Sequence, residues 1–390
     1  MKKKIISMVL TTAMAAAMLA GCGSSTASTA TTSTAASAAT TSTASSTASK
    51  AASTATSTAT STASKDSSVV TTASGLKIGF AQVGAESDWR TACTASVKDT
   101  FSEANGFTLL FDDAQQKQEN QITAIRNFIQ QEVDYIVLDP VTETGWDTVL
   151  QEAKDADIPV IVVDRQVDVS DDSLYTCAIG SDFKLEGDKA CAWLDAFLTA
   201  KGITDTVNIV DIQGTIGASA QIGRTQGLED AVKAHSNWNL LAETTGEFTQ
   251  AKGQEVMESF LKQYDNINVV YAENDNEAFG AIDAIKAAGK TVGSDIKNGQ
   301  IMVMTFDSTK AGLTDALDGS ITLDTECNPL YGPKLQEMIG QLQAGKTLDK
   351  MTYIDESMFS ADTSVTKVTV SGTDYPITAL TQSVIDSRSY

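Results

Sequence analysis

The feature that most constrains the fold is a regular alternation of apolar runs and amphipathic segments that begins at Leu76. The run at residues 158–163 is apolar and β-branched, which is typical of a strand buried on both faces of a parallel sheet. Between such runs lie segments with helical periodicity. In residues 88–105, for example, apolar residues recur at four-residue steps from Trp89 to Phe101. This alternation predicts right-handed βαβ units and a parallel sheet.

Two sets of such elements are expected. In the first set, strands at 76–82, 107–112, 134–138 and 158–163 alternate with helices at 88–105, 118–131 and 145–156. The second set begins after Ala178, with strands at 206–212, 240–244, 268–272, 301–306, 321–325 and 352–357, and helices at 184–200, 221–234, 250–264, 276–288, 309–318 and 332–344. About 315 residues exceed one ordinary core. We therefore expect an α/β protein with two doubly wound parallel-sheet lobes.

The N-terminus has the features of a secretory signal peptide at residues 1–21. Three lysines precede an apolar run at 5–20. A transmembrane anchor is the alternative, but the run is shorter than the roughly 20 residues that a membrane span needs. The tetrad that ends at Cys22 resembles the bacterial lipobox, and this resemblance implies cleavage before Cys22 and lipidation of its thiol.

Residues 22–75 form a linker that starts at the lipidated cysteine and consists almost entirely of Ser, Thr and Ala. Such a segment has too little apolar surface to offset the entropy of the chain, so we expect it to be disordered. As a flexible coil it would reach roughly 40 Å from its anchor.

The charge balance excludes some partners. Without Lys2, Lys3 and Lys4, 25 Lys and Arg oppose 50 Asp and Glu, a formal net charge of −25. This balance argues against binding to nucleic acid or to an anionic membrane surface.

The cysteines give no sign of a metal or redox site. After lipidation, Cys93, Cys177, Cys191 and Cys327 remain, and they form no CxxC or Cys/His cluster, so no metal and no cofactor is expected. Export permits disulfides, but the sequence does not pair these cysteines, and scattered buried thiols are favoured.

A carboxylate and a guanidinium follow the most apolar strand directly. Asp164 and Arg165 stand beyond its carboxyl end, where ligands bind in open α/β sheets. A carboxylate only accepts hydrogen bonds and a guanidinium only donates them, so the pair suits a hydroxyl-rich ligand. The alternative is an Asp that starts a turn and an Arg on the surface.

Similar side chains follow the other strands. They are Glu86, Trp89, Arg90, Gln213, Arg224, Phe248, Asn274, Asp275, Asp307 and Glu326. Acceptors, donors and aromatic faces are the combination that holds a neutral sugar. For single residues other roles stay open: Trp89 as helix core, Phe248 as packing, and Asn274 or Asp307 as helix caps.

Several segments together resemble the galactofuranose-binding branch of the ribose/galactose-type extracytoplasmic sugar-binding proteins. They are QVGAESDWR, DAQQKQENQI, PVTETGW, EAKDADIPVIVVDR, IQGTIGASAQIGR and KGQEVMESF, and the similarity extends over nearly the whole chain beyond Leu76. Ribose binders commonly carry two adjacent aromatics in the first loop. Trp89-Arg90 stands in that loop here and favours the galactofuranose-like branch.

The resemblance implies a set of ligand contacts. They are Glu86, Trp89, Arg90, Asp164, Arg165, Arg224, Phe248, Asn274, Asp307 and Glu326. Glu326 stands where ribose proteins tend to have Gln, so this contact departs from the pattern. The long linker and Cys22 also depart from a freely diffusing periplasmic protein.

The resemblance also implies two lobes joined by three crossing strands, near 178–181, 326–328 and 353–355. The first lobe would comprise residues 76–178 and 327–353, and the second 179–326 and 354–390. Such a protein is not an enzyme. It closes on a monosaccharide and delivers it to the permease of an ABC transporter, here as a monomer held at the outer face of the membrane by the lipid on Cys22.

Two other functions share this fold class. An exported carbohydrate-active enzyme could use Glu86 and Asp307 as acid and base, but the sequence has no nucleophile motif, and His235 lies at the polar end of a helix. A repressor would need a basic helix-turn-helix where the signal peptide and linker stand. A sensor that presents the ligand to a membrane receptor remains compatible. The identity and ring form of the sugar are left open.

Overall fold

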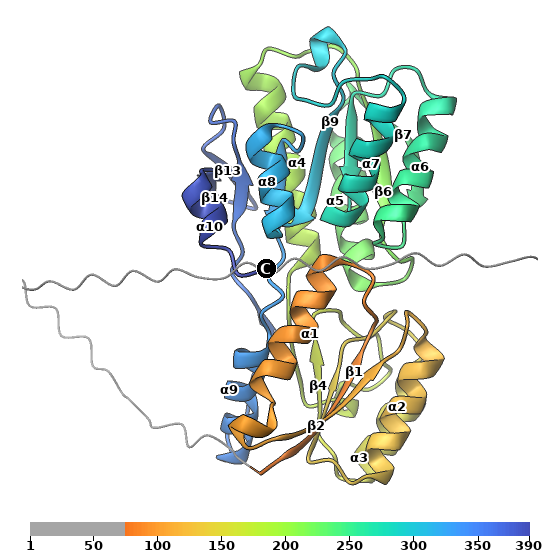
Figure 1. Cartoon of the computed structure of the whole chain (residues 1–390), viewed down its shortest axis with the longest axis vertical. Helices are drawn as coiled ribbons and strands as arrows, with labels where there is room; N and C mark the ends of the chain where they lie inside the picture. The colour runs from red at the N-terminus through yellow and green to blue at the C-terminus, as the bar shows by residue number, and fades with distance from the viewer. Residues whose placement is uncertain (1–74) are drawn as a thin grey trace, which may run out of the picture. The chain divides into compact units, whose positions relative to one another are not determined.

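The computed structural model describes residues 75–390. The expected signal peptide, the expected lipidation site at Cys22 and the expected linker up to residue 74 lie outside the described residues. In the described part, strands and helices alternate as the sequence predicts, and the strands form two sheets (Figure 1). No helix of this part is both long and apolar enough to cross a bilayer.

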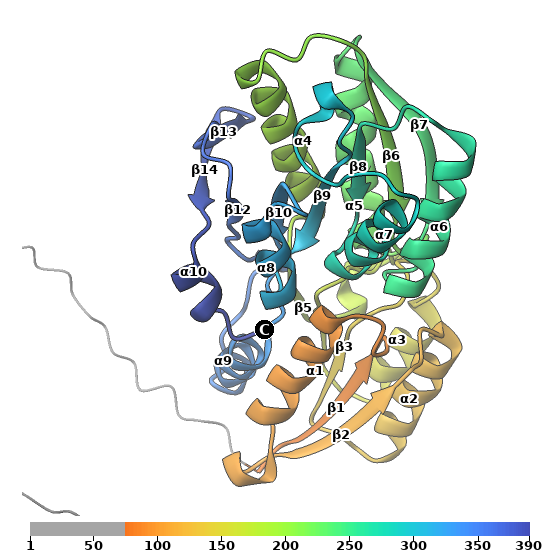
Figure 2. The same cartoon turned by 45° about the horizontal axis from the view of Figure 1, so that its top comes forward.

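The first sheet has six parallel strands in the order β11-β5-β4-β3-β1-β2. They are β1 (Lys77–Gln82), β2 (Thr108–Asp113), β3 (Tyr135–Leu138), β4 (Val160–Val163), β5 (Cys177–Gly180) and β11 (Met351–Tyr353). Helices α1 (Asp88–Thr100) and α9 (Gly332–Gln343) cover one face, and α2 (Gln118–Gln130) and α3 (Asp147–Asp155) the other (Figure 2). These elements form the first lobe.

The second sheet has eight strands in the order β13-β14-β12-β10-β9-β8-β6-β7. They are β6 (Val207–Gln213), β7 (Trp238–Thr245), β8 (Val269–Ala272), β9 (Met302–Asp307), β10 (Leu323–Glu326), β12 (Met358–Ser360), β13 (Lys367–Val370) and β14 (Thr373–Ala379). One face packs on α4 (Phe183–Ala200) and α5 (Ser219–Ala234), and the other on α6 (Gln250–Gln263), α7 (Asp275–Ala287), α8 (Lys310–Asp318) and α10 (Gln382–Asp386). This is the second lobe.

The chain passes between the two sheets three times. It leaves β5 for α4, β10 for α9, and β11 for β12. Because β5 ends at Gly180, the first crossing follows residue 180. These three connections, residues 181–182, 327–331 and 354–357, are called the crossings below.

The C-terminal part differs most from the sequence prediction. The single strand expected at 352–357 is two short strands, β11 and β12, which belong to different sheets. The sequence prediction also missed the antiparallel hairpin of β13 and β14 and the short helix α10 (Figure 2). The hairpin turns at Ser371 and Gly372, both at positive φ, as hairpin turns with a right-handed strand twist require.

Another difference lies at the end of α1. The helix expected at 88–105 stops at Thr100, and a separate 3-10 turn at Glu103–Asn105 follows before Gly106 adopts a left-handed conformation. The apolar face from Trp89 to Phe101 is buried as expected.

Two glycines let α4 and α5 approach closely enough to place polar groups between the lobes. A Cβ added to Gly187 on α4 would lie 2.9 Å from the backbone oxygen of Arg224, and one added to Gly227 on α5 would lie 2.7 Å from Gly187. This contact brings the carboxylate of Glu186, beside Gly187, to the guanidinium of Arg224.

We expect Gly227→Ala to destabilise the protein. Alanine gains up to about 1 kcal/mol in helix propensity, but the forced separation of two backbones costs about 1–3 kcal/mol. The free energy of unfolding in urea should fall, whereas Gln226→Ala, at the exposed neighbouring position, should change it by less than about 0.5 kcal/mol. Equal stability of the two variants would contradict the close helix contact.

Candidate ligand-binding site

One cavity lies where the carboxyl ends of strands from both sheets meet. About 280 Å³ between its wall atoms is unoccupied, a volume that includes the part open to solvent. Nine of the ten residues expected from the sequence line it: Glu86, Trp89, Arg90, Asp164, Arg165, Arg224, Phe248, Asn274 and Asp307. Ser87, Phe183, Ala220 and Cys327 complete the lining. That these side chains contact a ligand stays a prediction.

Glu326 does not line the cavity. Its carboxylate accepts hydrogen bonds from Arg388 Nη1 at 2.8 Å, from Tyr390 Oη at 3.0 Å and from the backbone N–H of Ser357 at 2.9 Å. The C-terminal residues therefore occupy this carboxylate, so the sequence prediction of a ligand contact at Glu326 is corrected.

The start of α1 places Trp89 and Arg90 at the cavity. Ser87 caps this helix by accepting a hydrogen bond from the backbone N–H of Arg90, so both side chains belong to its first turn. The indole N–H of Trp89 donates to the backbone oxygen of Cys327 at 2.7 Å, and its ring packs edge-on against Tyr331. Trp89 thus belongs both to the hydrophobic core and to the cavity wall, so the two roles considered from the sequence, helix core and ligand contact, are compatible.

Arg90 is buried among three carboxylates of the first lobe. Its Nε donates to Glu86 Oε1 at 2.8 Å, and its Nη1 contacts Asp164 Oδ2 at 2.9 Å and also bonds Asp139. Burial by itself would raise the pKa of Glu86, but the charges of Arg90 and Arg165 hold it below its ordinary value. Burial and the charge of Asp164 raise the pKa of Asp139.

Arg165 extends from the first lobe toward the second. Its Nη1 donates to the backbone oxygen of Val141 at 3.0 Å, and its guanidinium lies 5.1 Å from the ring centre of Phe248. Within residues 75–390, neither Arg165 Nε nor Glu86 Oε2 has a hydrogen-bond partner, although both are buried. A donor and an acceptor of this kind suit the hydroxyl groups of a ligand.

Arg224 is the cation of the second lobe. Its Nε donates to Glu186 Oε2 at 2.8 Å, and its Nη2 lies 3.8 Å from Asp307 Oδ1. Its guanidinium also lies over the rings of Phe183 and Phe306. Burial, together with nearby carboxylates, raises the pKa of Asp307 well above its ordinary value.

Phe248 adopts a left-handed backbone conformation with φ of 60°. Its N–H donates to Glu277 Oε1 at 2.8 Å, and its backbone oxygen accepts from Asn274 Nδ2 at 3.1 Å. A Cβ on Gly214 would lie 1.9 Å from its ring, so only glycine fits there. Asn274 also caps α7 through its Oδ1, so it is both the cap considered from the sequence and a part of the cavity wall.

Three further hydrogen bonds join the two lobes directly. The backbone N–H of Asp88 donates to Asn276 Oδ1 at 3.0 Å, that of Gln166 to Ser219 Oγ at 2.9 Å, and that of Glu143 to the backbone oxygen of Gly217 at 2.9 Å. These contacts close the lobes over the cavity.

The sequence prediction missed several residues that hold the site together. Asp139 and Glu273 directly follow β3 and β8, so the strand-end rule that found Asp164 could have found them. Glu186 lies within a helix, and no local pattern marks it. Away from the cavity, His235, which the sequence favoured as solvated, is about one-third exposed and stacks on Trp238. The four described cysteines are buried and unpaired, as the sequence favoured.

Comparison with known proteins identifies the family. Residues 78–332 match the periplasmic binding protein domain. The chain belongs to the periplasmic binding protein family. This membership and the two sheets agree with the fold and the family resemblance expected from the sequence.

Several members of the periplasmic binding protein family are close relatives. The galactofuranose-binding protein YtfQ of Escherichia coli (strain K12) is 41% identical over 301 residues, which cover 76% of this chain and 92% of YtfQ. A Mycobacterium smegmatis protein solved with β-D-fucofuranose is 44% identical, with a TM-score of 0.69, over 73% of this chain and 91% of that one. The arabinose-transporter binding protein of Shewanella sp. ANA-3, solved with L-arabinofuranose, is 40% identical, with a TM-score of 0.67, over 74% and 93%.

A group of buried carboxyls lies behind the cavity in the second lobe. Asp275 Oδ2 accepts from the backbone N–H and the hydroxyl of Thr309, whereas Asp275 Oδ1 and Asp324 Oδ2 are buried without a hydrogen-bond partner in residues 75–390. Burial raises the pKa of Asp275 to about 7 and that of Glu273 to about 8. The folded protein therefore holds protons that the unfolded chain releases near pH 4.

We expect the free energy of unfolding to decrease as pH rises from about 4 to about 8. Each such carboxyl contributes a slope of up to about 1.4 kcal/mol per pH unit between its unfolded and folded pKa values. Asp275→Asn keeps an acceptor for Thr309 and removes the titrating carboxyl, so this variant should flatten the curve below about pH 7. Urea titrations at a series of pH values test this, with the exposed Asp386→Asn as control. An unchanged slope in Asp275→Asn would refute the assignment.

Proposed function

We propose that this protein is an extracytoplasmic sugar-binding lipoprotein that captures one furanose monosaccharide by hinge closure and delivers it to the permease of an ABC transporter. The observation that carries this proposal is the convergence of nine polar and aromatic side chains from both lobes on one cavity. A ligand that contacts both lobes favours their closed arrangement, which is the form that a permease distinguishes.

The charges around the cavity favour a neutral ligand. Each buried guanidinium already faces a carboxylate of this chain: Arg90 and Arg165 face Glu86, Arg90 also contacts Asp164 and Asp139, and Arg224 pairs with Glu186. A charged ligand would add a charge without a partner to this buried site, at a high cost in desolvation. Sugar hydroxyls can bond both the carboxylates and the guanidinium groups, while the aromatic rings cover C–H faces.

The five-membered ring form is supported by the relatives. YtfQ is named for galactofuranose, and two relatives of 40–44% identity were solved with fucofuranose and arabinofuranose. The extracytoplasmic location follows the family, and the attachment to the membrane rests on the lipobox-like tetrad at Cys22. The same binding step would serve a sensor that presents the sugar to a membrane receptor.

A pair of ring-locked sugar analogues tests the ring preference. 1,4-Anhydro-D-galactitol keeps the five-membered ring and 1,5-anhydro-D-galactitol keeps the six-membered ring, and both lack only the anomeric oxygen. We expect the first to raise the melting temperature of the protein and the second to leave it unchanged, because a ligand stabilises the state that binds it. Stabilisation by the six-membered ring alone would contradict the furanose assignment. Turnover of the bound sugar would instead favour the enzyme alternative.

Arg165→Ala should weaken sugar binding about tenfold to a hundredfold. The variant removes a charged donor whose Nε has no partner within the described chain, and such a bond contributes about 1.5–3 kcal/mol. Calorimetric titration with galactofuranose or L-arabinose measures the loss. Arg126→Ala, which removes an exposed arginine paired with Glu152, is the matched control and should bind as the wild type does. Unchanged affinity in Arg165→Ala would remove this residue from the site.

A further inference from the structure

The carboxyl group of Glu356 connects all three crossings. Glu356 belongs to the third crossing, and its Oε1 accepts from Ser181 Oγ of the first crossing at 2.7 Å and from the backbone N–H of Asn328 of the second at 2.8 Å. Any rotation of one lobe against the other turns about these three segments, so this carboxyl lies at the pivot of closure.

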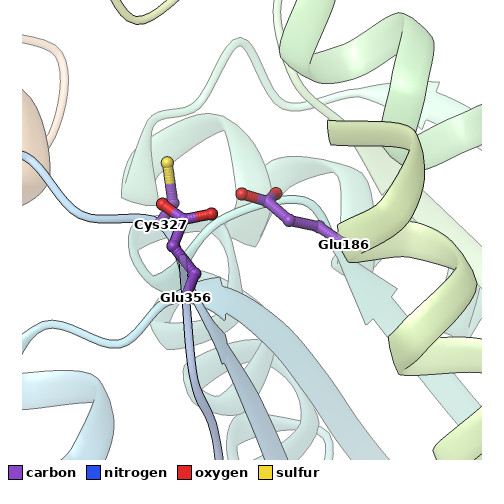
Figure 3. A group of neighbouring side chains, drawn as sticks. All are labelled: Glu186, Cys327 and Glu356. Atoms are coloured by element: carbon purple, nitrogen blue, oxygen red, sulfur yellow. The ribbon is translucent and has the colours of Figure 1, made fainter. Parts of the chain in front are cut away.

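A second carboxyl, that of Glu186, faces Glu356. Figure 3 shows the two carboxyl groups directed toward each other, with the thiol of Cys327 beside them. One oxygen of each carboxyl and the Cys327 sulfur all lie within 4.8 Å of one another. Glu186 is 1% exposed, and while its Oε2 bonds Arg224, its Oε1 has no donor among the side chains and backbone groups of residues 75–390.

We propose that Glu186 and Glu356 share one proton in the closed form, and that loss of this proton favours opening and weakens sugar binding. Two buried carboxylates that face each other cannot both stay ionised at low cost. One proton converts their repulsion into a short, strong O–H···O⁻ hydrogen bond. The inference deepens the proposed function and rests on it, because its main measurement is sugar affinity.

The surroundings of the pair support a shared proton. Burial raises the pKa of Glu186, against the opposing charges of Arg224 and Lys189. Burial and the charge of Glu186 raise the pKa of Glu356. The titratable and charged groups that face the pair are Arg224 from α5, Lys189 from α4, Asp307 from the end of β9, and Cys327 and Tyr331 from the second crossing.

A proton fits this place better than a metal ion. Arg224 and Lys189 already bring two positive charges to the pair, and Glu356 Oε1 already accepts two hydrogen bonds. Burial also raises the pKa of the Cys327 thiol well above its ordinary value, so sulfur stays protonated and is a poor ligand.

The direction of the pH effect follows from the raised pKa of the pair. The closed form holds the proton that an open, separated pair releases, so closure is favoured at low pH and loses this support as pH rises through the closed-form pKa. For one proton, sugar affinity should fall by up to about tenfold per pH unit between the pKa of the pair in the open form and its higher pKa in the closed form. Glu186 also bonds Arg224 of the cavity, so the pair is linked directly to the ligand site.

Glu356→Gln tests the proton with little change in shape. The amide oxygen can accept from Ser181 and Asn328, and the amide N–H can donate to Glu186, so the variant imitates the protonated acid. We expect calorimetric affinity within about threefold of the wild type at pH 5 and a much weaker decline up to about pH 9. Asp307 in the cavity also has a raised pKa, so it can add its own pH dependence to sugar affinity. The proposal is therefore tested by the difference in affinity between Glu356→Gln and the wild type at each pH. Glu337→Gln, on the exposed side of α9, is the matched control and should follow the wild type.

Ser181→Ala gives an independent test in the opposite sense. Without the Ser181 hydroxyl, the carboxylate of Glu356 loses a hydrogen-bond donor, so the pKa of the pair rises. The fall in sugar affinity should therefore occur at higher pH instead of disappearing. Parallel affinity curves for the wild type, Glu356→Gln and Ser181→Ala would overturn the shared proton. So would tight binding of Zn²⁺ to the wild type that Glu356→Gln abolishes.

The failure of this inference can be distinguished from that of the proposed function. If the wild type binds no sugar at any pH, the proposed function fails. The shared proton can then still be tested with the melting temperatures of the two proteins without ligand. The melting temperature of the wild type should fall relative to that of Glu356→Gln as pH rises. A constant difference between the two melting temperatures would overturn it.

Discussion

The structure depends on burying three arginines between two lobes. A guanidinium inside a protein is stable only when carboxylates and backbone oxygens surround it. Arg90 has Glu86, Asp139 and Asp164, and Arg224 has Glu186 and a backbone oxygen of Glu273. These partners fix the directions of the remaining hydrogen-bonding atoms before any ligand arrives, which lowers the entropy cost of binding. The same partners leave Arg165 Nε and Glu86 Oε2 free of bonds within the described chain.

The backbone at the strand ends adopts uncommon conformations to present these groups. Asp164, Phe248 and Asp307 have φ values of 61°, 60° and 108°, a region that non-glycine residues rarely occupy. Close glycines make room for them, since a Cβ on Gly180 would lie 2.2 Å from the backbone oxygen of Asp164. Strain of this kind persists where the surrounding structure holds it, and it concentrates at binding sites. Three residues of the cavity wall share this strain, which agrees with a binding site whose geometry is formed before the ligand binds.

The sequence predicted the fold and most of the site because both follow from local patterns. The buried run before Asp164 marks a strand end, and parallel strands bring their carboxyl ends to one edge, so Asp164, Asn274 and Asp307 could be grouped without coordinates. Glu326 is also at the end of a strand, but its partner Arg388 is 62 residues away, and no local pattern shows such a bond. The same limit applies to Glu186 and Glu356, which are far apart in the sequence and come close only in the folded chain.

The central claim is that atoms from two lobes meet around one small neutral sugar without changing it. A crystal structure of the protein with a bound furanose tests this most directly. The account predicts one intact sugar ring in the cavity, with its hydroxyl groups bonded to Arg165 Nε and Glu86 Oε2 of the first lobe and to Asp307 or Asn274 of the second. A sugar that binds outside the cavity, or that contacts one lobe alone while these atoms stay without partners, would contradict it.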